Sequence, residues 1–111
     1  MAEGKIKQQS NTYMTGYASK EVPYRTETVV TSILLPAGQW LVINYMSLSA
    51  SGAGVYNNIL GNVSVRSPEN NGGGSINARV ETGPVNMDAK CYHNVSNGCT
   101  VNNRWYAIKL L

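Results

Sequence analysis

The chain has 111 residues, of which nine are Lys or Arg and six are Asp or Glu, giving a formal net charge of +3. This length accommodates one domain with a modest core and excludes a two-domain enzyme. Charged residues make up only 14%, whereas Asn, Ser, Thr and Gly together supply 41 of the 111 residues, so neutral polar groups dominate the surface. A hydrophobic content of 42% with so small a net charge excludes an intrinsically disordered chain.

Charge and hydropathy also exclude two kinds of partner. The nine basic residues are scattered along the chain, which makes a poor track for phosphates, so no nucleic-acid partner is expected. The aliphatic runs are far shorter than the roughly 20 residues of a membrane helix, so no membrane insertion is expected. The polar first ten residues lack the apolar core of a secretory signal, and we expect them to be disordered or linker-like.

The chain reads as a series of short strands. Apolar residues recur with period two, and Gly, Asn and Pro interrupt the pattern about every ten residues, which predicts antiparallel strands and no long helix. Residues 1–25 are expected to form a flexible segment or connector with a possible first strand at 13–18, and residues 26–111 a single domain. Within that domain the predicted strands lie at 28–35, 40–50, 59–66, 75–82, 85–94, 100–102 and 104–111.

Two of these strands have faces of particular interest. The strand at 40–50 places Leu41, Ile43 and Tyr45 on one face, and on the other Trp40, Val42, Asn44, Met46 and Leu48. Both faces are apolar at its start, so we expect both to be covered. The strand at 75–82 is expected to direct inward its apolar residues Ile76, Ala78 and Val80.

Gly, Pro and Asn mark the connections between strands. A turn at 36–39 ends the strand at 28–35, and the Gly83-Pro84 pair breaks the chain between two later strands. Asn97-Gly98 has the composition of a type I′ hairpin turn. Segments 51–58 and 68–74 are expected to be exposed loops, because Gly and Asn there cannot pack a core.

The two cysteines, Cys91 and Cys99, can form one bridge or none. A hairpin turn at 97–98 would pair Cys99 with Ser96 and place Cys91 out of bonding range, which favours free thiols. Cys91 and His93 share a strand face, which a catalytic Cys–His dyad would require. Asp88 lies on the opposite face, however, and the sequence shows no motif for an oxyanion hole, so a catalytic dyad is not expected.

Other groups of residues do not indicate a metal-binding, catalytic or phosphate-binding site either. Cysteine and histidine spacing does not match structural zinc, and no pair of carboxylates is arranged as in a glycosidase. The glycine run at 72–74 lacks the Lys-Ser/Thr of a phosphate-binding loop. We therefore expect no catalytic residue, no metal and no cofactor.

Three segments together are informative: ILLPAGQWLV at 33–42, the Gly- and Asn-rich middle, and WYAIKL at 105–110. This combination resembles the trimeric tip domains of bacteriophage tail fibres, head fibres and tail needles, which have a tumour-necrosis-factor-like jelly roll. The resemblance covers 28–111 and implies an all-β, antiparallel jelly-roll β-sandwich that forms a homotrimer. The chain departs from this family at its amino end. Fibre proteins usually carry a long stem before the tip, whereas here only some 25 residues precede the predicted strand at 28–35.

The resemblance also implies roles for single residues. It assigns Tyr106, Ile108 and Leu110 to the trimer axis, with Tyr45 as their neighbour on the same sheet, and Trp105 to the core. In a trimer of this kind neighbouring copies cover one sheet, which fits the strands that are apolar on both faces.

The expected function is that of a non-enzymatic virion attachment domain, either receptor-binding or fibre-capping. It would be made in the host cytoplasm, lie on the virion surface, recognise a host-cell surface glycan or protein, and contact other virion proteins through its amino terminus. Candidate receptor contacts are Tyr56, Asn57, Asn58, Glu69, Asn70 and Asn71. The alternative is a monomeric β-sandwich carbohydrate-binding module in which Trp and Tyr form a stacking platform, and an enzyme is a third, weaker option.

Overall fold

The computed structural model describes residues 5–6, 12–49, 55–67 and 74–111. The fold is all β, an antiparallel jelly-roll sandwich in which the short β1 runs parallel to β3. The described strands are β1 (Lys5–Ile6), β2 (Tyr13–Val22), β3 (Thr28–Ser49), β4 (Tyr56–Leu60), β5 (Val63–Ser67), β6 (Gly74–His93) and β7 (Cys99–Lys109). Across the described ranges, no helical segment has the length and apolar character needed to span a bilayer.

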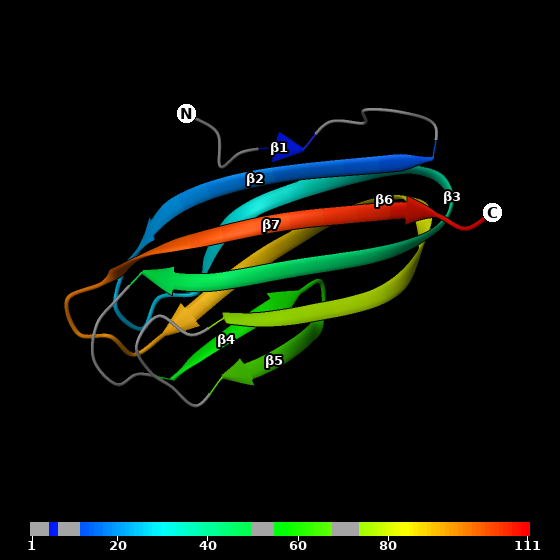
Figure 1. Ribbon diagram of the computed structural model, residues 1–111. Coiled ribbons are helices and arrows are strands. Elements are labelled where there is room, and N and C mark those ends of the chain that lie inside the picture. Colours follow the sequence, from blue (N-terminus) through cyan, green and yellow to red (C-terminus); the bar gives the residue numbers. More distant parts are fainter. Residues whose placement is uncertain (1–4, 7–11, 50–54, 68–73) are drawn as a thin grey trace.

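Two long strands, β3 and β6, pass from one layer of the sandwich to the other (Figure 1). Residues 38–49 of β3 and 74–83 of β6 form the first layer in the order β2-β7-β3-β6. Residues 28–35 of β3 and 85–93 of β6 form the second layer in the order β1-β3-β6-β4-β5. We call these layers the β7 sheet and the β4 sheet.

Both long strands bend at one corner, which lies at the end of the molecule that holds the carboxyl terminus (Figure 1). A Cβ atom on Gly83 would lie 1.8 Å from the Pro36 carbonyl oxygen, so only glycine fits where the two backbones cross. Gly38 also favours glycine, because its φ of 124° is a positive value that residues with a Cβ atom rarely adopt. The Trp40 indole N–H donates to the Pro36 carbonyl at 3.0 Å and closes the bend of β3. The predicted turn and the predicted break are thus the two halves of one corner.

The core lies between the layers and is built from alternate residues of the facing strands. Of the two predicted faces of the strand at 40–50, the one with Trp40, Val42, Asn44, Met46 and Leu48 points into the core, and the expected burial of Trp105 is confirmed. Each large apolar side chain buried here stabilises the fold by roughly 1.5–3 kcal/mol. The fully buried side chains include Met14, Val30, Ile33, Leu35, Trp40, Val42, Met46, Leu60, Val101 and Trp105.

A buried polar cluster also links the two layers. The side-chain amides of Asn44 and Asn103 exchange hydrogen bonds of 2.9 and 2.7 Å within the β7 sheet. From the β4 sheet, the Thr31 hydroxyl donates to Asn103 Oδ1 at 2.8 Å and accepts a hydrogen bond from Trp105 Nε1. Leaving such a buried group without a partner costs about 1–3 kcal/mol, so the cluster favours one alignment of the layers.

The amino-terminal part of the domain is larger than the sequence pattern suggested. β2 pairs with β7 over Tyr13–Val22, and the side chains of Met14 and Val22 lie in the core. The possible first strand at 13–18 is therefore present and longer. The domain thus includes residues before 26, because β1 pairs with β3 and these two side chains of β2 are buried between the layers.

Two further predictions about strands are wrong. The strand expected at 59–66 is a hairpin of β4 and β5, because Gly61-Asn62 forms a tight turn in which Gly61 has a φ of 62°. The turn at Asn97-Gly98 does not pair β6 with β7, because β6 ends in the β4 sheet and β7 begins in the β7 sheet. This connection crosses between layers.

Candidate functional site

The outward side of the β7 sheet carries apolar residues in three successive rows. The row nearest the corner contains Tyr13, Ile108, Leu41 and Val80 in register, and the next contains Tyr106, Ile43 and Ala78. In the third row Tyr45 and Ile76 stand beside Arg104. We call the following set the apolar face: Tyr13, Leu41, Ile43, Tyr45, Ile76, Ala78, Val80, Tyr106 and Ile108.

The β6 part of this face has its polarity inverted. The side chains of Ile76 and Val80 are 61% and 52% exposed, whereas Asn77 between them is buried. The prediction that Ile76, Ala78 and Val80 point inward is wrong, since the inward positions of this edge strand are taken by polar residues that bond to the opposite layer. The pattern thus leaves apolar side chains on the outward side of the sheet, a surface that monomeric proteins seldom expose.

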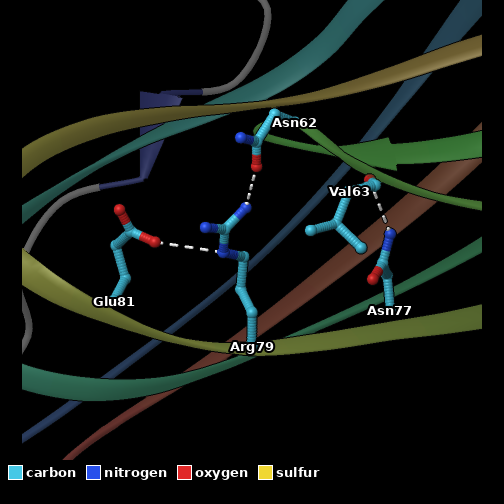
Figure 2. A network of polar contacts seen from close by, with 5 residues as sticks. All are labelled: Asn62, Val63, Asn77, Arg79 and Glu81. Carbon is cyan, nitrogen blue, oxygen red and sulfur yellow. Dashed lines mark hydrogen bonds and ion pairs between the residues drawn. The ribbon is translucent and has the colours of Figure 1, made fainter.

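Figure 2 shows what holds the inward side of β6. Asn77 donates to the Val63 carbonyl at 3.0 Å, and Arg79 Nη1 donates to Asn62 Oδ1 at 2.5 Å. Arg79 Nε lies 3.0 Å from Glu81 Oε1. These contacts close the open edge of the sandwich between β6 and the β4–β5 turn.

A hollow of about 260 Å³ beside this network is lined by charges of both signs, Arg79 and Lys90 against Glu81 and Asp88. Arg79 is paired with Glu81, and Lys90 Nζ lies 3.2 Å from the Glu27 carboxylate. Each cation therefore has an acidic partner within the protein. We assign these groups to stabilisation of the edge.

The sequence-predicted interface residues come together in part. Tyr45, Tyr106 and Ile108 all lie on the apolar face, with exposed fractions of about 40% each. The Tyr45 ring leans over the start of β6, where a Cβ on Gly74 would lie 2.5 Å from its hydroxyl. Leu110 lies past the end of β7 at the corner, exposed, with its N–H donating to the Gln39 carbonyl at 2.6 Å.

The end of this sheet away from the corner is polar. The Tyr17 hydroxyl and the Ser19 hydroxyl each donate to Asn102 Oδ1 at 3.0 Å. The Arg104 guanidinium lies 5.0 Å from the centre of the Tyr17 ring, a cation–π contact. Tyr17, Tyr45 and Arg104 line a hollow of about 240 Å³ at the border of the apolar face.

The predicted receptor contacts divide into three groups. Tyr56 and Asn58 are buried on the inward side of β4, so their assignment as surface contacts is wrong. The Tyr56 hydroxyl donates to the Met46 carbonyl and Asn58 donates to the Ser75 carbonyl, which explains their burial. Asn57 points outward and lines a hollow on the β4 sheet. Glu69, Asn70 and Asn71 lie outside the described residues.

The cysteines and the histidine lie in the core as separate groups. Both thiols are free and buried. His93 Nδ1 accepts from the Val95 N–H at 3.0 Å, so Nε2 carries the proton and donates to the Val22 carbonyl at 2.8 Å. Both ring nitrogens are thus used by backbone groups. Among the described residues, no group of three His, Cys, Asp or Glu side chains is arranged to hold a metal ion.

Comparison with known proteins finds only weak structural similarities. No protein-family model matches the chain, and no curated protein matches it in sequence. Among solved structures, the whole chain aligns with 30% of the capsular polysaccharide assembling protein CapF from Staphylococcus aureus, at 7% identity and a TM-score of 0.41. The chain thus spans under a third of CapF.

Two further structures share a similarly weak likeness. A predicted oxalate decarboxylase from Thermotoga maritima aligns over 97% of this chain and 95% of its own, at 12% identity and a TM-score of 0.36. Latent PorU from Porphyromonas gingivalis aligns over 99% of this chain and 14% of its own, at 8% identity and a TM-score of 0.34. Similarities at this level carry no functional argument.

Proposed function

We propose that this chain is a non-enzymatic homotrimeric attachment domain of a bacteriophage particle, in which the apolar face packs against two further copies. The observation that carries the proposal is the inverted pattern of β6, which turns Ile76, Ala78 and Val80 outward and Asn77 and Arg79 inward. Residues from β2, β3 and β7 extend this surface across the whole β7 sheet. Monomeric proteins rarely leave so continuous an apolar surface in water.

The composition of the surface fits a protein interface. Three tyrosines of the apolar face combine large apolar area with a polar hydroxyl, and Arg104 stands at its border. Tyrosine and arginine are enriched where proteins associate, whereas scattered lysine and glutamate are depleted. The polar end at Ser19 and Asn102 would form the hydrated rim of the contact.

The number of copies and the place in a virion rest on the resemblance of segments 33–42 and 105–110 to phage fibre tips. With the β7 sheets turned toward a common axis, the β4 sheets of all three copies face outward and are free to meet a host-cell surface. The amino terminus would then link the domain to other virion proteins.

A monomeric carbohydrate-binding module remains the second candidate, because Tyr13, Tyr17, Tyr45 and Tyr106 lie on one flat sheet surface. Exposed rings in such an arrangement can stack on sugars. Trp40 and Trp105 take no part in a platform, since both are fully buried. The two candidates differ in what covers the tyrosines.

Native mass spectrometry of the full chain distinguishes them. We expect a particle of three chains for the parent protein and monomer or aggregate for Ile108→Glu, because assembly would bury the new charge against its symmetry copies at a cost of several kcal/mol. Val80→Glu, on a different strand of the apolar face, should have the same effect.

The matched control is Leu34→Glu, which places the same charge on an exposed aliphatic residue of the β4 sheet. It should leave the trimer intact. A parent protein of single-chain mass would refute the assembly, and binding of a neutral oligosaccharide by that monomer would favour the carbohydrate-binding module. An Ile108→Glu protein that stays trimeric would show that the apolar face is not the interface.

A further inference from the structure

The outward side of the β4 sheet contains a hollow of about 290 Å³ whose charged residues are all basic. Arg66, Asn57 and Tyr92 stand in register across β5, β4 and β6 and form its floor. Arg25 and Asn94 complete its rim at the end of β6. This hollow lies on the layer opposite the apolar face and is separate from the hollow beside Arg79.

The rim is fixed by hydrogen bonds that involve backbone groups. The Arg25 N–H donates to the His93 carbonyl at 2.9 Å, which ties the β2–β3 connection to the end of β6. The Val55 N–H donates to Asn94 Oδ1 at 2.7 Å, and the Asn94 N–H donates to the Val55 carbonyl at 3.1 Å. The backbone at the rim of the hollow is therefore held in place before any ligand arrives.

The backbone of Arg25 is strained. Its φ of 50° lies in the left-handed region that residues with a Cβ seldom adopt. Such a conformation persists where surrounding contacts fix it, and it is over-represented at binding sites. Here it occurs at a basic residue that lines the hollow.

Charge distinguishes this hollow from the one beside Arg79, which is lined by charges of both signs. Arg79 and Lys90 have carboxylate partners, but neither Arg25 nor Arg66 forms an ion pair with any described residue. The Arg25 guanidinium lies 5.3 Å from the centre of the Tyr24 ring, which leaves its donors available. Two guanidinium groups without an acidic partner among the described residues, both at one hollow, attract an anion.

We infer that this hollow binds an anionic sugar, a residue of a surface polysaccharide that carries a carboxylate or a sulfate. Guanidinium groups hold both anions with paired hydrogen bonds. The Asn57 amide and the Asn94 Nδ2 group supply donors for sugar hydroxyls, and the half-buried Tyr92 ring offers a face for the sugar. The volume lies at the lower end of the roughly 300–1,000 Å³ of ligand pockets, which suits one or two sugar rings.

Two other anions fit the hollow less well. A nucleic acid needs a track of several cations, and this hollow has two. A free inorganic anion would use the arginines but leave the amides and the Tyr92 ring without a role. The inference deepens the proposed attachment function by naming its ligand class, and it rests on that function for the source of the sugar.

Calorimetric titration of the full chain tests the inference with matched probes. The carboxylate pair is trigalacturonate against the neutral galactose trimer, and the sulfate pair is galactose 6-sulfate against galactose. Inorganic sulfate and hexaglutamate represent a free anion and an acidic peptide. We expect one of the two anionic sugars to bind at least about tenfold more tightly than its neutral counterpart, inorganic sulfate and hexaglutamate. Tighter binding of trigalacturonate would identify the anionic group of the ligand as a carboxylate, and tighter binding of galactose 6-sulfate would identify it as a sulfate.

Variants then locate the site. Arg25→Gln and Arg66→Gln should each weaken the binding about tenfold or more, because each removes a charged hydrogen-bond donor. The affinity of Arg66→Lys should lie between that of these two variants and that of the parent. Lysine keeps the positive charge but cannot form the paired hydrogen bonds of a guanidinium group. Lys90→Gln removes the same charge from the same sheet outside the hollow, and should leave the affinity within about twofold.

Three results would overturn the inference. These are equal binding of a neutral sugar or of hexaglutamate, the absence of binding by both anionic sugars, and parent-like binding by both arginine variants. Titration does not depend on how many chains associate. Loss of sugar binding in a protein of trimeric mass would therefore reject this inference alone, whereas sugar binding by a monomer would reject the trimer alone.

Discussion

Cys91 illustrates how burial controls a single side chain. Its thiol faces the core from the end of β6, and burial raises its pKa from 9.0 to about 12, with the nearby Cys99 thiol adding to the shift. Burial raises the pKa of Cys99 as well. Both thiols therefore stay protonated and unreactive at neutral pH.

This shift predicts a loss of stability in alkali. Between pH 9 and pH 12 the unfolded chain releases the Cys91 proton while the folded chain keeps it, so the free energy of unfolding falls as pH rises. At pH 10.5 the loss from this group amounts to about 2 kcal/mol relative to pH 8. Urea unfolding at both pH values measures it.

Cys91→Ala provides the comparison. The cavity lowers its stability at every pH, but its decline between pH 8 and pH 10.5 should be smaller than that of the parent by about 2 kcal/mol. Equal declines in the two proteins would mean that Cys91 titrates at its ordinary pKa in the folded state.

The alternation of residues along each strand correctly predicted which side chains of most strands share a face. The predicted inward direction was wrong for β6, which lies at the edge of the β7 sheet. Trp40, Met46 and Trp105 are buried as expected, because both neighbouring strands and the opposite layer cover them. Ile76 and Val80 point outward because Asn77 and Arg79 find hydrogen-bond partners across the sandwich. A rule that turns apolar residues inward cannot detect this, since it takes no account of hydrogen-bond partners on the opposite layer.

At the level of whole elements, the corner of β3 and β6 depends on Gly83. A Cβ at this position would lie 1.8 Å from the Pro36 carbonyl oxygen, which belongs to the bend of the partner strand. Both backbones would have to move, so Gly83→Ala should lower the free energy of unfolding by more than about 3 kcal/mol. Guanidinium unfolding of the variant measures this.

The exposed neighbour Thr82 serves as the control. Thr82→Ala changes the same strand beside the corner without a backbone clash, so its effect should stay within about 0.5 kcal/mol. A Gly83→Ala protein as stable as this control would mean that the corner can open without affecting the layers.

Strand composition was easier to predict than strand connection. The segments 28–35 and 40–50 are the two limbs of β3, and 75–82 and 85–94 are the limbs of β6. Gly and Pro between the limbs indicate an interruption but do not distinguish a strand end from a bend that changes layers. Asn97-Gly98 carried the same ambiguity, since a turn that joins two layers has the composition of a hairpin.

At the scale of the molecule, the two outer surfaces of the sandwich have different chemistry. The β7 sheet presents the apolar face, and the β4 sheet presents the hollow with Arg25 and Arg66. If copies associate through the first surface, the second stays accessible on the outside of the assembly. The resemblance supplied the proposed interface residues Tyr45, Tyr106 and Ile108, whereas the hollow combines four segments of chain and has no sequence signature.

If copies associate through the apolar face, stability also depends on protein concentration, because only the folded chain assembles. For a trimer that unfolds to single chains, a tenfold rise in concentration stabilises each chain by two thirds of RT ln 10, or about 0.9 kcal/mol. Since about 1 kcal/mol shifts the melting temperature of a domain near 100 residues by roughly 4–8 °C, the parent should gain about 4–7 °C per tenfold concentration. Leu34→Glu should keep this dependence, and Ile108→Glu should lose it. Calorimetric scans over a hundredfold concentration range measure the slope, and a parent protein whose melting temperature stays constant over that range would contradict assembly through this face.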